Sequence, residues 1–136
     1  MAARRAKFLG WGYEGDGLTP DEEEMVLGRY AERFDLDGFE RVPHPDEQAI
    51  PLHTPRVEVP AKLAAICSSE RHDRLTHTYG KSFPDYVRIY DSAFANAPDI
   101  VAYAKSEEDV VEVLDWATGA NVAVVPFGGG SSVVGG

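Results

Sequence analysis

Pro126-Phe-Gly-Gly-Gly-Ser-Ser-Val-Val-Gly-Gly136 is the stretch of sequence that decides the fold of this chain. It follows the apolar run Val122–Val125, which predicts a buried strand. A strand that leads into a Gly-rich turn is a common way to present backbone N–H groups to a phosphate. Glycine has no Cβ, so it allows the backbone to approach a ligand and to adopt positive φ. The residues therefore indicate an anion-binding loop, with a plain Gly-rich turn as the alternative.

The region before this loop predicts a strand–helix–strand unit. Asp99–Ala104 is the expected first strand, and Ser106–Asp109 is a capping-box variant with acids in the first helical turn. One face of the helix is apolar: Val110, Val111, Val113, Leu114 and Ala117. Gly119 fits the C′ position, Asn121 fits the following turn, and Val122–Val125 is the second strand. Such a unit implies a parallel pair of strands with a right-handed crossover.

The chain before Pro98 predicts an irregular lead segment that contains helices. Thr19 can cap a helix, Pro20 suits its first position, and Asp21–Glu24 complement its positive end. An apolar stripe follows: Met25, Val26, Tyr30, Ala31 and Phe34. The acidic run is therefore interpreted as a solvated first turn rather than as a binding site.

Prolines then dominate the sequence from residue 43 to residue 60. They predict an extended, polyproline-like arm at Pro43, Pro45, Pro51, Pro55 and Pro60. A short helix is expected over Ala61–Ser69, with Leu63 and Ile66 facing inward. A further helix is expected after Ser82, because that residue can cap and Asp85 lies three positions on.

Composition excludes several classes of function. The 136 residues are 43% hydrophobic and carry a net charge of −10, which is typical of a globular chain and argues against general nucleic-acid or anionic-membrane binding. Local backbone dipoles can still bind an anionic cofactor whatever the net charge is. No segment approaches the roughly 18–20 apolar residues of a membrane span. Cys67 is the only cysteine, so neither a disulfide framework nor a metal cluster is expected.

The loop does not match the common phosphate-binding signatures. A Walker A loop needs a lysine, and none lies near. In the dinucleotide fingerprint a third glycine should follow Gly128 and Gly130, but Val133 stands there.

Four stretches together resemble the FAD-linked oxidase superfamily, with its PCMH-type FAD-binding domain and vanillyl-alcohol oxidase fold. They are Thr78–Ser82, Ala97–Tyr103, Glu107–Trp116 and Val124–Gly136. Within that superfamily the chain is most similar to the alkyldihydroxyacetonephosphate synthase-like flavoproteins. Gly10-Trp-Gly-Tyr13, the acidic helix and the Pro-rich arm resemble the N-terminal extension of that subgroup.

The resemblance implies an α+β fold: a helical, Pro-rich segment over residues 1–97, then an incomplete FAD-binding domain over 98–136. It implies FAD as the cofactor, with its pyrophosphate wrapped by the loop. The cofactor-binding residues would be Pro126, Phe127, Gly128, Gly129, Gly130, Ser131, Ser132 and Val133. Gly135 and Gly136 would begin the turn into the next element. The residues that carry catalysis in the subgroup lie outside this chain, so no catalytic residue is assigned.

The chain is accordingly expected to be the N-terminal part of an FAD-dependent oxidoreductase or alkylglycerone-phosphate synthase-like flavoprotein. Its expected partner is the downstream half, which would bind a small-molecule or lipid-precursor substrate. The substrate would be either an acylated dihydroxyacetone phosphate or a 2-hydroxy acid or alcohol. No residue of this chain distinguishes between these two substrate classes. The alternative is a non-catalytic, stand-alone protein or an inactive remnant of a split gene. A cytoplasmic location is the default expectation.

The remaining polar and aromatic candidates have structural interpretations. Arg71–Arg74 with His77 is expected to form a polar loop with local ion pairs, with Arg74 as a possible anion contact, and not a metal site. Lys81 and Ser82 could contact a phosphate, although helix capping is the preferred interpretation. Cys67 is expected to behave as a small buried hydrophobe. Trp11 and Tyr13 are expected to anchor the N-terminus to the body of the protein or to a partner chain.

Overall fold

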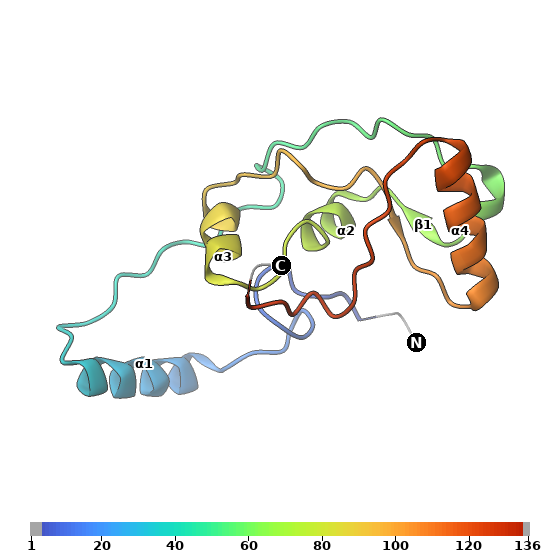
Figure 1. Cartoon of the computed structure of the whole chain (residues 1–136). Helices are drawn as coiled ribbons and strands as arrows, with labels where there is room; N and C mark the ends of the chain where they lie inside the picture. Colours follow the sequence, from blue (N-terminus) through green and yellow to red (C-terminus); the bar gives the residue numbers. More distant parts are fainter. Residues whose placement is uncertain (1–3, 135–136) are drawn as a thin grey trace. The chain divides into compact units, whose positions relative to one another are not determined.

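The computed structural model describes residues 4–134 and divides the chain into two compact units (Figure 1). One unit comprises Met1–Lys7 and Trp11–His44, and the other comprises Phe8–Gly10 and Pro45–Gly136. Within the described part the elements are four α-helices, one 3-10 helix and one two-stranded sheet, so the predicted α+β class is confirmed. Gly135 and Gly136, predicted to begin a further turn, lie outside the described residues. The division at residue 97 stays a prediction.

Helix α1, Pro20–Phe34, belongs to the first unit and begins as predicted. Thr19 and Glu22 form a reciprocal capping box: the Glu22 N–H donates to the Thr19 hydroxyl at 3.3 Å, and the Thr19 N–H donates to the Glu22 carboxylate at 2.8 Å. The helix ends at Asp35, whose φ of 52° is left-handed. No residue of α1 is buried: of its predicted apolar stripe, Val26 and Ala31 are half-buried, and the other three residues are exposed.

The second unit has a small core where α2, Arg71–Thr76, and α3, Phe83–Tyr90, meet the surrounding loops. Its buried members are Phe8, Ile50, Leu75, Ile89, Phe94 and Ala97. The prediction of a polar loop over Arg71–Arg74 is wrong, because these residues form most of α2. The helix is favoured because it buries Leu75, while the Arg74 Nε–H donates to the Pro98 carbonyl at 2.6 Å.

The predicted start of α3 is confirmed in detail. The Asp85 N–H donates to the Ser82 hydroxyl at 3.3 Å, and the Ser82 N–H donates back to the Asp85 carboxylate at 3.1 Å. Both side chains are buried, and Arg88 donates to the other carboxylate oxygen at 3.0 Å. Burial acts to raise the pKa of Asp85, but the bonds from Ser82 and Arg88 outweigh it and lower the pKa.

From Pro45 to Pro60 the chain forms no helix or strand, as the prolines predict. Polar contacts fix this arm to the rest of the second unit. Arg71 donates to the Ile50 carbonyl at 2.6 Å, and the His53 Nε2 lies 3.0 Å from the Ala97 carbonyl oxygen. Arg56 holds Asp99 through three groups: its backbone N–H at 2.9 Å, its Nε at 3.0 Å and its Nη2 at 2.7 Å.

The Arg56–Asp99 contact predicts an acid-sensitive step in stability. The hydrogen bond from Arg56 lowers the pKa of Asp99 and outweighs burial, which acts in the opposite direction. Because the folded pKa lies below the unfolded one, Asp99 stabilises the fold at pH values above about 4. That contribution is lost as the pH falls through the folded pKa. We expect Asp99→Asn to flatten the acid side of a plot of unfolding free energy against pH.

Urea unfolding at a series of pH values measures this effect. Asp115→Asn is the matched control, since Asp115 lies exposed on α4, Glu107–Gly119, and the substitution removes the same charge. Identical acid profiles for the two variants would show that the Arg56 contact contributes nothing.

The sheet pairs β1, Cys67–Ser68, with β2, Val101–Ala102, in antiparallel register, with Cys67 opposite Ala102. The helix predicted over Ala61–Ser69 is therefore too long. Its first turn is the 3-10 helix η1, Ala61–Leu63, which buries Leu63 as predicted. The chain then leaves the helix because β2 offers a ladder partner, and the Tyr103 N–H extends the pairing by donating to the Ile66 carbonyl at 2.8 Å.

Helix α4 begins as predicted, since the Asp109 N–H donates to the Ser106 hydroxyl at 3.1 Å. Its end differs from the prediction. Gly119 is the last helical residue, and the left-handed position is taken by Asn121, with φ of 54°. Of the predicted apolar face, only Ala117 is buried, while Val110, Val111 and Leu114 are each close to half exposed.

The predicted strand Val122–Val125 does not form in the described structure. A strand needs a ladder partner, and in residues 4–134 the only sheet is the β1–β2 pair, which is antiparallel. The predicted parallel crossover is therefore wrong for this part of the chain. Val122 is half-buried, whereas Val124 is 44% and Val125 83% exposed, so the described residues cover this apolar segment only in part.

Candidate functional site

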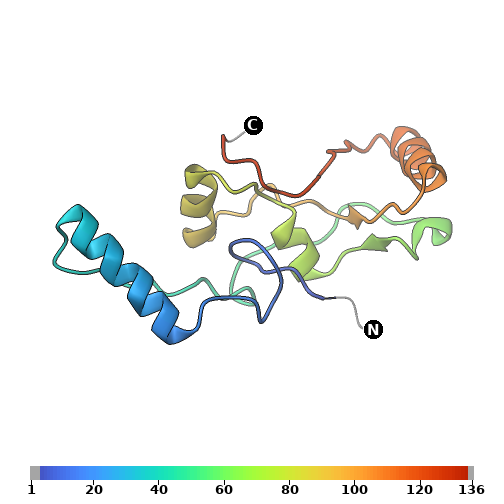
Figure 2. The same cartoon turned by 90° about the horizontal axis from the view of Figure 1, so that it is seen from below.

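The Gly-rich loop, Pro126–Val133, lies at the surface of the second unit. It has no regular secondary structure, and Gly130 is its one half-buried residue while the other seven are exposed. In Figure 2 the loop lies in the red C-terminal segment, which passes the turn between α2 and α3. The predicted site residues are thus contiguous and accessible to a ligand.

The backbone of this loop offers hydrogen-bond donors that the chain does not use. Within residues 4–134, no backbone N–H from Phe127 to Val134 donates to another backbone carbonyl. The same stretch contributes no N–H to the recorded backbone-to-side-chain bonds in that described range. Exposed N–H groups of this kind otherwise donate to water, and a run of them along a Gly-rich bend can donate to an anionic ligand instead.

Gly130 shapes the loop through its backbone conformation. Its φ is +59°, which L side chains rarely adopt. A Cβ at this position would also lie only 2.5 Å from Cζ of Phe127, whose ring covers the glycine. Gly128 differs, because a Cβ there would meet nothing within 4 Å. Gly130 therefore fixes the bend, whereas Gly128 leaves open space beside the backbone.

A second segment, His77–Ser82, supports the loop and was not predicted to touch it. The Lys81 N–H donates to the Ser132 carbonyl at 2.8 Å. A Cβ on Gly80 would lie 2.9 Å from that same oxygen, so the close approach depends on glycine. The His77 ring lies against the Phe127 ring with 4.5 Å between centroids. Gly80, two residues before the Ser82 cap, was the one sequence signal for this contact.

His77 is held in place by neighbours on two sides. Its Nδ1 lies 2.7 Å from the Asp73 carbonyl oxygen, and its ring meets the Tyr103 ring edge-on at 5.5 Å. The Tyr103 hydroxyl donates to the Asp73 carboxylate at 2.9 Å. Burial, followed by this bond to Asp73, raises the pKa of Tyr103 well above its usual range. Tyr103 is therefore neutral at physiological pH and acts as a packing and hydrogen-bonding group.

Lys81 is the cationic residue that borders the loop. Burial lowers the pKa of its ammonium group, and the nearby Asp85 carboxylate partly opposes that shift. Ser82, the other residue considered as a phosphate contact, is buried and caps α3, which agrees with the preferred interpretation.

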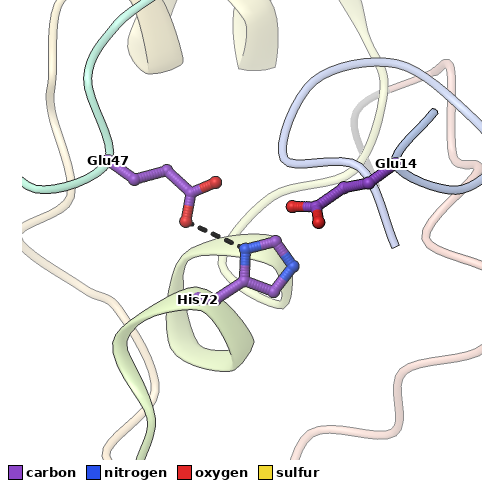
Figure 3. Close-up of side chains that lie close together, drawn as sticks. All are labelled: Glu14, Glu47 and His72. Carbon is purple, nitrogen blue, oxygen red and sulfur yellow. Dashed lines mark hydrogen bonds and ion pairs between the residues drawn. The ribbon is translucent and has the colours of Figure 1, made fainter. Parts of the chain in front are cut away.

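The other polar candidates form internal contacts. The His72 Nδ1 lies 2.9 Å from Oε2 of Glu47, as the dashed line in Figure 3 marks. Arg74 is 4% exposed, and its Nε–H donates to the Pro98 carbonyl, so its side chain is held by an internal contact. Cys67 lies half-buried in β1, and burial raises the pKa of its thiol. Such a thiol is a poor nucleophile, consistent with its predicted structural role.

The two predicted anchoring aromatics lie in the first unit and remain accessible. Trp11 is 58% exposed and Tyr13 is 43% exposed. Tyr13 pairs with Ala6 in an antiparallel bridge and its ring lies 4.5 Å from the Arg4 guanidinium. Tyr13 therefore contacts neighbouring residues of its own unit, and the anchoring of the N-terminus to the body of the protein or to a partner chain stays a prediction.

Comparison with known proteins links this geometry to a cofactor. Residues 98–136 match the family described as "FAD binding domain". The chain is 42% identical over 62 residues to an alkyldihydroxyacetonephosphate synthase of Dictyostelium discoideum, covering 46% of this chain and 10% of the relative. It is 39% identical over 67 residues to the Trypanosoma brucei brucei protein of the same name, covering 49% of this chain and 11% of that protein.

A solved structure of alkyldihydroxyacetonephosphate synthase aligns over 96% of this chain and 29% of its own, with 26% identity and a TM-score of 0.73. A second, at 24% identity and a TM-score of 0.72, shows the same fold. The chain thus spans about a tenth of the length of the curated relatives it matches.

These matches confirm the predicted resemblance to synthase-like flavoproteins and indicate FAD as the cofactor.

The helices of the described structure can also be compared with the requirements of a membrane-spanning helix. None of the helices in residues 4–134 combines the length and apolarity that a bilayer crossing requires.

Proposed function

We propose that this chain supplies the pyrophosphate-binding loop of the FAD site in a flavoprotein similar to alkyldihydroxyacetonephosphate synthase. The donors would be the backbone N–H groups of Phe127 to Val133, assisted by the hydroxyls of Ser131 and Ser132. The observation that carries the proposal is the run of open N–H donors, which lies inside the segment that matches an FAD-binding domain.

The local chemistry of the loop fits a diphosphate. Hydrogen bonds to a charged acceptor contribute roughly 1.5–3 kcal/mol each, so a few donors suffice for specific binding. Gly128 and Gly129 carry no side chain that would keep the ligand from the backbone, while Gly130 sets the bend. The chain's net charge of −10 opposes an anion, so binding depends on these local dipoles.

In this proposal the flavin, once bound, supplies the redox-active ring, and the chain's own residues bind and orient the diphosphate. The rest of the FAD-binding domain and the substrate site would come from residues outside this chain. An acylated dihydroxyacetone phosphate is the proposed substrate class, by similarity to the synthases. We also propose a cytoplasmic location, which the single, unpaired Cys67 supports.

Flavin retention tests the proposal. The purified chain is passed through gel filtration with FAD, alone and mixed with a polypeptide that supplies the rest of the domain, and flavin absorbance is read across the protein peak. We expect flavin to be retained in the mixture. In the Ser131→Ala/Ser132→Ala double variant, loss of two hydroxyl donors should raise the Kd for FAD by about tenfold or more.

Thr118→Ala is the control for this measurement. This substitution also removes a hydroxyl group. The Thr118 hydroxyl, however, donates to the Leu114 carbonyl within α4 and is not part of the Gly-rich loop. Equal FAD affinity in the double variant and the control would show that the serine hydroxyls do not contribute to FAD binding. Absence of flavin from every sample would favour the alternative of a non-catalytic protein.

A further inference from the structure

We infer that the turn His77–Ser82 is a clamp that holds the Gly-rich loop in its anion-binding shape. This segment precedes the part of the chain that matches the FAD-binding domain, residues 98–136, and its contact with the loop extends the cofactor site beyond that match. The inference rests on the proposed function, because it concerns how the same loop is positioned.

Three contacts of different chemistry converge on the loop. The first is the hydrogen bond from the Lys81 N–H to the Ser132 carbonyl, 2.8 Å long. The second is the van der Waals contact at Gly80, where a Cβ would lie 2.9 Å from the Ser132 oxygen and 3.3 Å from the Ser132 Cβ. The third is the ring contact between His77 and Phe127, 4.5 Å between centroids.

The contacts lie at both ends of the bend. Phe127 enters the bend and covers Gly130, while Ser132 leaves it. Fixing both ends restricts the backbone between them, so the N–H donors of Gly128 to Ser131 are held together before a ligand arrives. A loop ordered in advance loses less conformational entropy on binding and therefore binds more tightly.

The clamp is itself anchored in the core. Tyr79 donates its hydroxyl to the Ala93 carbonyl, and its ring packs on Phe94 at 5.3 Å. Ser82 is buried and bonded to Asp85 in the first turn of α3. Because Tyr79 and Ser82 are fixed, Gly80 and Lys81 between them present a defined surface to the loop.

The test uses the isotopically labelled chain and nuclear magnetic resonance. Backbone ¹⁵N relaxation reports the order of residues 127–133 without any ligand, and amide shifts during an ADP titration report diphosphate affinity. We expect Gly80→Ala to increase the fast motion of the loop and to raise the Kd for ADP by about tenfold, the loss expected when donors no longer converge.

Three further variants separate positioning from general damage. Gly119→Ala adds the same methyl group at the end of α4, where a Cβ meets nothing within 4 Å, and should leave loop motion unchanged. His77→Ala removes the ring contact without adding atoms and should loosen the loop, whereas His77→Phe keeps a ring against Phe127 and should restore its order.

Loop motion that is the same in the wild type, Gly80→Ala and His77→Ala would overturn the clamp. If instead Gly80→Ala loosens the loop but no variant and no wild-type chain responds to ADP, the clamp stands and the proposed function fails. The relaxation measurement and the titration thus give separate answers.

Discussion

Replacing Gly130 by alanine is expected to weaken FAD binding by the assembled site about tenfold or more. The backbone of Gly130 has φ of +59°, which costs an L residue roughly 1–2 kcal/mol. The added Cβ would also lie 2.5 Å from Cζ of Phe127, which is closer than real Cβ contacts, so the ring or the bend must move. Movement of the bend would spread the open N–H donors that we propose for the diphosphate.

Titration of the variant with FAD, followed by flavin fluorescence, measures this effect. The conformational cost alone corresponds to about a tenfold rise in Kd or more, and the steric clash adds to it. Gly119→Ala is the control, because it adds the same methyl group on α4, where a Cβ meets nothing within 4 Å, and it should keep the wild-type affinity. Wild-type affinity in Gly130→Ala would mean that the described bend is not the binding shape.

Replacing Phe94 by alanine is expected to unfold most of the second unit. Phe94 is 2% exposed and packs between Phe8, at 6.1 Å between ring centroids, and Tyr79, at 5.3 Å. Truncation of a buried phenylalanine costs about 3–5 kcal/mol, which is a large part of the 5–15 kcal/mol typical of a whole domain. The core of this unit has few buried side chains to compensate for the cavity.

Phe83 provides the matched control, because it is 82% exposed at the start of α3 and the substitution is chemically identical. Phe83→Ala should change the free energy of unfolding by less than about 0.5 kcal/mol. Urea unfolding followed by circular dichroism compares the two variants. A loss below about 1 kcal/mol in Phe94→Ala would show that the described core does not stabilise the chain.

The features predicted well are those that depend on neighbours in the sequence. The starts of α1, α3 and α4 follow from Thr19, Ser82 and Ser106, each of which accepts the expected backbone N–H. The identity of the loop as a distinctive Gly-rich bend is equally local. Such signals survive because caps and turns are formed by residues three or four positions apart.

The features predicted wrongly depend on distant partners. Val122–Val125 has the composition of a strand, but no described strand lies beside it, and Cys67–Ser68 pairs with β2 instead. The helix α2 was missed because its polar residues suggested a loop. Their partners, such as the Pro98 carbonyl for Arg74 and Glu47 for His72, are more than twenty positions away.

The candidate site likewise has local features that could be predicted and long-range features that could not. The donors of the loop could be predicted because the glycines are adjacent in the sequence. Its support by His77, Gly80 and Lys81 could not, because about fifty residues separate that turn from Ser132 and no periodic pattern links them. Gly80 was a local signal. Glycine is needed there, however, because the carbonyl of the distant Ser132 approaches it closely.

The most direct test of the central claim is an amide-shift titration of the labelled chain with FAD, ADP and riboflavin. We expect FAD and ADP, which share a diphosphate, to shift the amides of Phe127 to Val133 together with that of Lys81. Riboflavin, which lacks phosphate, should not shift them. Shifts confined to other residues, or the same loop shifts with riboflavin, would contradict the claim that this loop binds the diphosphate of FAD.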